Sequence, residues 1–453
     1  MRRMYRLPLV ALIISLGWMM PNSGALAQGG LAIIRDAEIE GILRAYTTPL
    51  FEAAGIPPKS VKIRLINRNS LNAFVAGGRN IFVHTGLLTA SKGPDAVIGV
   101  LAHEIGHIEG GHLVRTRAAI KEAGTMQVLG TLLGVIAAVG TKNSEAGQAI
   151  ILGSQSAATN TFMKYSRTQE SAADQAAMRL MDETERSSKG LESFLSQLGE
   201  QEVLTRRLQD PYAQTHPLSR DRIQTLRNHI TSSPYSKRAP TEDELLSHAI
   251  VVAKIKAFFN PFRNTLRAYP ESDTSFPARY ARTIAYYRDA QIDKALPMIN
   301  QLIAEMPKNP FLRELKGQML FEFARADEAL EAYTQAVQLA PDEPLIIMEL
   351  ARVELEVGTP DMLDKAIGHY KAVHRLGGAN GFTWKQLGIA FGRKGDMTMS
   401  SLALAESELR TGQIQNAEYH ANRALDGLKV GSPEHLQAQD ILEAIKTVKS
   451  RRK

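Results

Sequence analysis

The chain has 453 residues, of which 44% are hydrophobic and 22% are charged, and it contains no cysteine. This composition excludes a disordered chain, a collagen-like chain and a disulfide scaffold, and the length predicts two or three domains. Without cysteine, any metal site must use histidine and carboxylate ligands. The formal net charge is +7. No nucleic-acid-binding motif accompanies this charge, so we expect no nucleic-acid partner.

Residues 1–27 are typical of a secretory signal peptide. Three arginines within the first six residues precede an apolar stretch from Leu7 to Met20, and Ala25-Leu26-Ala27 forms a small-x-small cleavage site before Gln28. The alternative is an uncleaved membrane anchor, for which the stretch is short, since a span needs about 20 residues. We therefore expect a secreted protein.

The next residues predict a small sheet with helices. Helical periodicity marks 36–54, and alternation of apolar residues marks strands at 61–66 and 80–84. Pro94 opens a helix that stops at Gly110-Gly111, and a further helix is predicted over 166–181. In this interpretation the strand at 80–84 offers an edge to an extended substrate, and its His84 is structural.

Residues Met126 to Val139 carry no charge. At about fourteen residues, the segment is too short for a comfortable bilayer crossing. It is either a buried helix of the domain or an element that contacts a membrane or an apolar substrate.

The second half of the chain repeats. Pro307 and Pro341 lie 34 residues apart, and each follows an alanine, Ala295 or Ala329, by twelve residues. These offsets resemble those of tetratricopeptide repeats over about 276–445, with an irregularity near 359–363. We therefore predict a signal peptide at 1–27, a first domain at 28–232, a linker and bridging helices at 233–275, and a repeat domain at 276–453.

The motif His103-Glu104-x-x-His107 stands within the helix predicted from Pro94. Histidines four residues apart share a helix face, with Cβ atoms about 5–6 Å apart, so both imidazoles can bind one Zn²⁺. Glu104 lies about 100° round the axis, where it can take a proton from a water at the open metal position instead of binding the metal. The alternative is a pair of structural histidines beside an ion-paired glutamate.

The third metal ligand is expected among the acids that follow, since two histidines and one carboxylate suit a catalytic zinc site. Glu170 lies 63 residues after His107, and Asp174 follows it by one helical turn. We predict that Glu170 binds the metal and that Asp174 accepts the free ring N–H of a ligand histidine. The alternative for Asp174 is a solvated acid on a helix surface.

A competing zinc motif is not met. Gly110, three residues after His107, agrees with the metzincin pattern, which requires a histidine at position 113. That position holds Leu113, and His112 stands one residue early. We expect His112 to be a surface or cap residue.

Taken with Ser166-Arg167-x-x-Glu170-x-x-x-Asp174, the histidine motif resembles the zinc peptidase family that includes the CAAX prenyl endopeptidases. Further matches, which extend the resemblance over about 30–230, are Asn72-Ala73-Phe74, the Gly77-Gly78 turn, and Thr215-His216-Pro217 with Arg222 and Ile223. The resemblance implies one zinc ion on His103, His107 and Glu170, with Glu104 as the base. The implied fold class is mainly α with a small β-sheet, a zincin-like domain followed by a tetratricopeptide α-solenoid.

The role of His216 stays open at this stage. It could stabilise the oxyanion of the tetrahedral intermediate, with Arg222 nearby, or occupy the fourth zinc position and displace the catalytic water. A structural role is the third possibility. Residues Asn72, Ala73 and Phe74 are candidates for substrate binding.

The predicted function is a zinc-dependent endopeptidase in protein quality control. The signal and the repeats are similar to those of the periplasmic branch of this family, which implies unfolded or misassembled outer-membrane proteins as clients. The same resemblance implies the outer-membrane β-barrel assembly machinery as partner, reached through the repeat face. The alternative is a chaperone or assembly adaptor that acts through its repeats, with a largely latent metal site.

Overall fold

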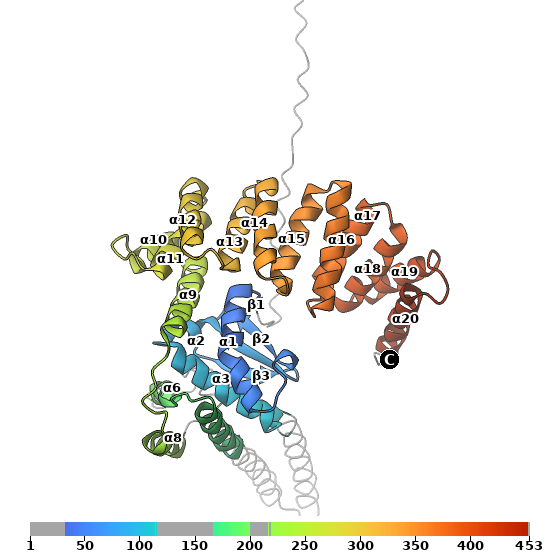
Figure 1. The fold of residues 1–453 in the computed structure, drawn as a ribbon. Coiled ribbons are helices and arrows are strands. Elements are labelled where there is room, and N and C mark those ends of the chain that lie inside the picture. Colours follow the sequence, from blue (N-terminus) through green and yellow to red (C-terminus); the bar gives the residue numbers. More distant parts are fainter. Residues whose placement is uncertain (1–31, 114, 116–165, 200–215, 217–218, 452–453) are drawn as a thin grey trace, which may run out of the picture.

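The computed structural model describes residues 32–113, 115, 166–199, 216 and 219–451. The predicted signal peptide and the uncharged segment 126–139 lie outside these ranges. Figure 1 shows a mixed α/β unit, coloured blue to green, that lies against a row of helix pairs coloured yellow to red. No helix in the described ranges is both long and apolar enough to cross a membrane.

The first unit is built on a four-stranded sheet with the order β1-β2-β4-β3. Its strands are β1 (Ile33–Ile34), β2 (Lys62–Ile66), β3 (Ala73–Ala76) and β4 (Asn80–His84). The central strands β2 and β4 are parallel, and both edge strands pair antiparallel to them. Gly77 and Gly78 turn the β3–β4 hairpin with positive φ, which side chains disfavour. The prediction of an edge at 80–84 is therefore wrong, because β3 covers that strand.

Helices pack on this sheet and beside it. They are α1 (Ala37–Ala53), α2 (Thr85–Ala90), α3 (Pro94–Glu109), a helix over 166–183, α6 (Lys189–Gly199) and α8 (Arg220–Ser232), with a short 3-10 turn η1 at Pro58–Ser60. The side chain of Asp36 caps α1 by accepting from the N–H of Ile39, and Pro94 occupies the first turn of α3. The helices predicted over 36–54, from Pro94 to Gly110 and over 166–181 are confirmed.

Helix α9 (Glu242–Phe259) belongs to two hydrophobic cores at once. Val251 and Ile255 pack into the core of the first unit, whereas Ile250 and Ala257 pack with the first repeat helices. Because α9 packs into both cores, packing fixes its position relative to each of the two units. This helix and α10 (Phe262–Ala268) are the helices found within the segment 233–275, for which a linker and bridging helices are predicted.

The remaining helices form five consecutive pairs. They are α11 (Phe276–Arg288), α12 (Ile292–Glu305), α13 (Pro310–Glu322), α14 (Ala326–Leu339), α15 (Pro344–Val357), α16 (Pro360–Arg375), α17 (Gly381–Arg393), α18 (Met397–Arg410), α19 (Ile414–Leu425) and α20 (Pro433–Arg451). A Cβ atom at Gly317 would lie 2.6 Å from the ring of Tyr333, so the glycine lets the paired helices α13 and α14 touch. The predicted α-solenoid is confirmed.

Candidate metal centre

Helix α3 carries the two motif histidines on one face. His103 and His107 stand four residues apart, and their Nε2 atoms lie 3.0 Å from each other. His103 has no exposed surface, and Glu104 is 1% exposed. The local spacing thus brings two imidazole nitrogens to one point and places a buried carboxyl group next to them.

Gly106, between the two histidines, lets a second helix approach α3. A Cβ atom at position 106 would lie 2.8 Å from the carbonyl oxygen of Ala173 in the helix over 166–183. A larger residue would push that helix away, and Glu170 is one turn before Ala173 on it. The glycine is therefore a condition for the third predicted ligand to reach the first two.

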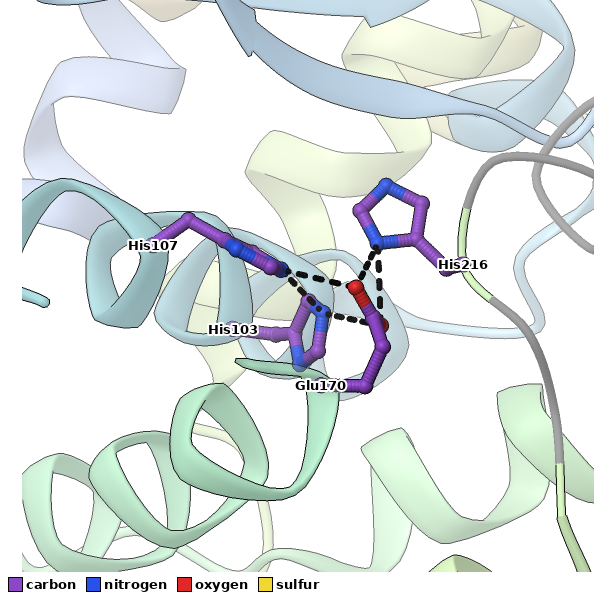
Figure 2. Close-up of side chains that lie close together, drawn as sticks. All are labelled: His103, His107, Glu170 and His216. Atoms are coloured by element: carbon purple, nitrogen blue, oxygen red, sulfur yellow. Dashed lines mark hydrogen bonds and ion pairs between the residues drawn. The ribbon is translucent and has the colours of Figure 1, made fainter. Parts of the chain in front are cut away.

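Figure 2 shows the carboxylate of Glu170 between the imidazoles of α3 and the ring of His216. Its Oε2 lies 3.4 Å from His103 Nε2, and its Oε1 lies 3.4 Å from His107 Nε2. His216 Nδ1 lies 3.2 Å from Oε1 and 3.1 Å from Oε2. One ligand atom from each of these four residues lies within 4.8 Å of the others.

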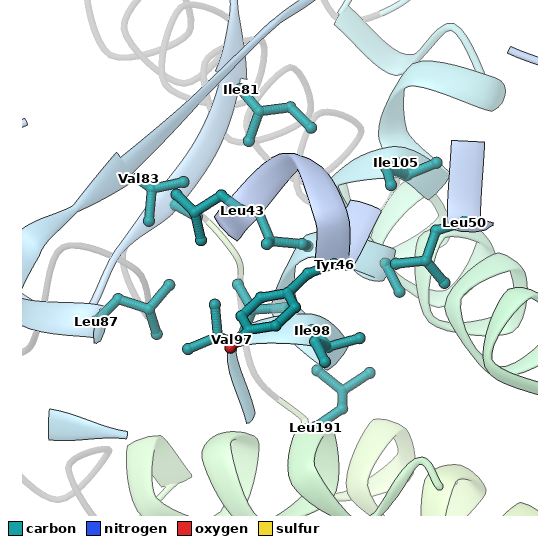
Figure 3. Packing of buried hydrophobic residues seen from close by; sticks show 14 of the residues in the cluster. Leu43, Tyr46, Leu50, Ile81, Val83, Leu87, Val97, Ile98, Ile105 and Leu191 are labelled. Carbon is teal, nitrogen blue, oxygen red and sulfur yellow. The ribbon is translucent and has the colours of Figure 1, made fainter. Parts of the chain in front are cut away.

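The cluster rests on a tightly packed hydrophobic core, part of which Figure 3 shows. Val97, Ile98 and Ile105 of α3 have no exposed surface and pack with Leu43 of α1 and Val83 of β4. Each fully buried aliphatic side chain contributes about 1.5–3 kcal/mol to folding. The backbone that carries the motif is therefore held rigidly before any metal binds.

Asp174 and Arg222 support the site from behind. Asp174 Oδ1 lies 2.9 Å from His103 Nδ1, a distance at which it can accept the free ring N–H of that histidine. Arg222, in the first turn of α8, donates from Nε at 2.6 Å and from Nη2 at 2.8 Å to the same carboxylate. Its Nη1 lies 3.0 Å from Glu170 Oε2. This buried guanidinium thus joins the two acids of one helix and fixes their orientation.

His112 lies behind His107, and the expectation of a surface or cap position is wrong. Its side chain is 5% exposed, and its Nδ1 lies 3.0 Å from His107 Nδ1. Gln169 Nε2 donates to its backbone carbonyl at 3.3 Å. Since the predicted helix stops at Gly110-Gly111, helical periodicity carried no information on where the next side chain points.

The charges of the site are strongly coupled. Burial disfavours a charge on His103, but its bonds to Asp174 and Glu170 outweigh burial and raise its pKa. Burial lowers the pKa of His107, which keeps that ring neutral, as a metal ligand must be. Burial would raise the pKa of Glu170, yet the surrounding histidines hold it well below its usual range. The anionic carboxylate of Glu170 and the neutral ring of His107 are two donors suited to a cation.

At the metal centre, Glu104 is a buried acid that no described side chain neutralises at short range. Among the described residues, no side chain lies within hydrogen-bond distance of its carboxylate oxygens, and its hydrogen-bonding neighbour is the backbone of Val75 in β3. The nearest recorded contact is His216 Nε2, 3.6 Å from Oε1. Burial raises the pKa of this carboxyl group, and His216 opposes that rise. A buried carboxylate without a side-chain partner among the described residues fits a site in which solvent or substrate supplies the further partner.

The donor set fits zinc better than calcium or magnesium. Three imidazole nitrogens and a carboxylate oxygen are ligands that zinc prefers, whereas the alkaline-earth ions require mostly oxygen. The structure also places His216 in the cluster itself, and it places Arg222 on Asp174 and Glu170.

The candidate substrate residues start the edge strand β3. Asn72 is buried, and its carbonyl accepts from the N–H of His84 at 2.9 Å. Phe74 stacks on Phe82 with ring centroids 5.2 Å apart. His84 is buried with its Nδ1 2.6 Å from Ser70 Oγ, in the structural position expected for it.

Comparison with known proteins agrees with this geometry. Residues 35–230 match Peptidase family M48. The β-barrel assembly-enhancing protease of Escherichia coli (strain K12) is 22% identical over 420 residues, covering 87% of this chain and 84% of that protein. The same protein of Yersinia pestis is 22% identical over 390 residues, with coverages of 85% and 79%. A putative one of Vibrio cholerae serotype O1 is 28% identical over 256 residues, with coverages of 54% and 51%.

Residues 35–230 therefore form a peptidase family M48 domain, and the protein is a metallopeptidase. It is similar to β-barrel assembly-enhancing proteases over most of its length.

Proposed function

We propose that this metallopeptidase is a zinc-dependent endopeptidase of the periplasm that cleaves misfolded or stalled outer-membrane proteins and assists their assembly. The observation that carries the catalytic part is the buried carboxyl group of Glu104 beside a converging set of metal-ligand atoms. Similarity to β-barrel assembly-enhancing proteases over most of the chain supports the client class. The signal predicted at 1–27 supports the compartment.

The chemistry follows from the side chains present. His103, His107 and Glu170 would hold one zinc ion, which supplies Lewis acidity to a water molecule and to the scissile carbonyl. Glu104 accepts the proton of the attacking water and then donates it to the leaving amine. Its raised pKa suits a group that must both accept and release a proton near neutral pH. Asp174 keeps the proton of His103 on Nδ1, so that Nε2 is free to bind.

Substrate would lie along β3. Among the described residues this strand pairs only with β4, so its outer edge is open to an extended chain. Main-chain pairing gives affinity with little sequence preference, which suits a protease for unfolded clients. Of the three candidates, Ala73 would contact substrate through its backbone, because the carbonyl of Asn72 already bonds β4 and alternate residues of a strand face the same neighbour, which also turns the backbone of Phe74 to β4.

His216 has a proposed regulatory role. Its position in the ligand cluster suits a fourth ligand that holds the site closed until its loop moves, whereas an oxyanion role requires it to act on substrate. In the first case His216→Ala raises peptidase activity. In the second case the same substitution lowers activity.

The decisive experiment measures metal and cleavage together. Elemental analysis of the purified chain should give one zinc ion per molecule, and casein or an unfolded outer-membrane protein should be cleaved. Glu104→Gln keeps the volume of the side chain and removes the base, so it should retain zinc and lose cleavage. Cleavage at the parental rate by this variant would overturn the catalytic proposal.

A second function is favoured by one observation, the place of His216 among the ligand atoms. If that arrangement persists in the cell, the metal site is largely latent, and the repeats act as a chaperone or as an adaptor for the outer-membrane β-barrel assembly machinery. Full in-cell function of the Glu104→Gln variant would favour this adaptor role. Loss of in-cell function would favour the peptidase.

A further inference from the structure

A cavity of about 280 Å³ lies between the peptidase domain and the repeats. Its walls come from β1, the start of α1, the last turns of α9, and the repeat helices α13 and α15. Because β1 and β3 are opposite edges of the sheet, this cavity is separate from the metal centre, which lies beside β3. Residues of both domains and of the bridging helix are needed to form it.

Carboxylates outnumber cations around this cavity. Lys254 of α9 is 3% exposed, and its Nζ lies 2.9 Å from Asp36 Oδ2 and 3.0 Å from Glu38 Oε2, so one ammonium serves two acids. On the repeat side, Arg352 Nη1 lies 2.7 Å from Glu349 Oε2. Both of these cations are thus already engaged with acids, and so is Arg35, the third cation that lines the cavity, which pairs with Glu40.

Glu314 is an acid of the cavity wall that neither Lys254 nor Arg352 pairs with. It projects from α13 into the cavity, and it makes no ion pair or hydrogen bond with any residue in the described part of the chain. Its pKa is raised to about 8, chiefly by burial; Lys254 opposes the rise, and the neighbouring Asp36 and Glu349 add to it. A carboxyl group held in such surroundings has its charged form restored by an added cation.

The walls of this cavity suit an organic cation better than a metal ion. In the described ranges, the only set of three or more histidine, aspartate and glutamate side chains that converge on one point is at the metal centre. The carboxylates around Glu314 therefore form no such three-residue set. The walls are instead suited to a cation on an apolar stem, because Phe258 and Phe321 line the cavity. The guanidinium of Arg352 already lies 5.2 Å from the ring centroid of Phe321.

The edge of the sheet indicates what carries this cation. Strand β1 pairs only with β2 among the described residues, and Ile33 is 50% exposed, while Ile34 lines the cavity. An extended chain that pairs with this edge would pass the cavity at side-chain distance. We propose that the cavity binds an arginine or lysine side chain on an extended segment of a partner protein, with Glu314 as its counter-ion. This binding does not require peptide-bond cleavage and is independent of the metal centre.

The test uses the full chain with Glu104→Gln, so that probes stay intact. Two fluorescent twelve-residue peptides of alternating serine and leucine are compared by anisotropy, one with a central arginine and one with its neutral isostere citrulline. The arginine peptide should bind about ten-fold tighter or more, since one partner of a desolvated charge pair is missing from the other complex. Glu314→Gln should abolish this preference, and Glu331→Gln, an exposed acid on α14, should retain it.

Equal affinity for both peptides would overturn the proposal, and so would a preference that persists in Glu314→Gln. Glu314→Lys is the second variant, because it supplies its own cation and should exclude the arginine peptide while the chain stays folded. The last measurement adds free arginine as a competitor of the bound peptide. If it competes with the peptide at equal concentration, the site binds a small molecule, and the proposal of an extended partner segment is wrong.

Discussion

Replacing His112, whose ring nitrogen contacts His107, should weaken zinc binding without unfolding the protein. His112 Nδ1 lies 3.0 Å from His107 Nδ1, and among the described residues no carboxylate contacts this Nδ1 as Asp174 contacts that of His103. When His107 binds metal through Nε2, its Nδ1 carries the proton, and His112 is the acceptor that holds the ring in place. His112→Phe keeps the aromatic volume and removes the acceptor.

The expected loss of zinc affinity can be estimated from hydrogen-bond partners of metal ligands in other proteins. Loss of such a partner lowers metal affinity by about 10–100-fold, which corresponds to about 1.4–2.7 kcal/mol. The fold itself should change little, because the substituted ring fills the same buried space. His112→Asn places an amide oxygen near the same position and should recover part of the affinity.

The assay is competition for zinc with a chelating dye, combined with thermal unfolding of the metal-free chain. The matched control is His248→Phe, since His248 is also buried but bonds the backbone carbonyl of Ser91 at 3.2 Å, away from the metal centre. Zinc affinity should fall for His112→Phe alone. Parental zinc affinity in a folded His112→Phe chain would refute the reasoning, as would an equal loss in the control.

Lys254→Met leaves the buried Glu38 and the half-buried Asp36 without their cation and should lower the free energy of unfolding by about 3–5 kcal/mol in urea titrations. A loss below about 1 kcal/mol would contradict this expectation. Glu314 has its pKa raised from 4.5 to about 8, so the folded chain keeps a proton that the unfolded chain loses over this window. Its destabilisation is therefore absent below about pH 4.5 and complete above about pH 8, and Glu314→Gln should raise the melting temperature at high pH only. A gain that does not vary with pH would contradict the assignment. Gly317→Ala places a Cβ 2.6 Å from the Tyr333 ring and should destabilise by about 1–3 kcal/mol, whereas Gly368→Ala, with nothing within 4 Å, should not; equal melting temperatures would argue against this packing.

Several features of the molecule could be predicted because they depend on neighbours in the chain. The four-residue spacing of His103 and His107 puts both on one face of any helix, and a helix from Pro94 to Gly110 follows from local signals. The repeats were recognisable because each pair of helices makes the same local contacts at a fixed period.

The rest depends on contacts between distant segments. The order of strands, which makes β3 and not β4 the edge, follows from pairing across the sheet, and no local pattern in 80–84 reveals it. The burial of His112 and the fork of Arg222 on Asp174 arise where separate helices meet. The surplus charge at Glu314 likewise exists only where both domains and α9 come together. Periodicity tells which face of an element is buried, but the partner of that face is decided by packing in three dimensions.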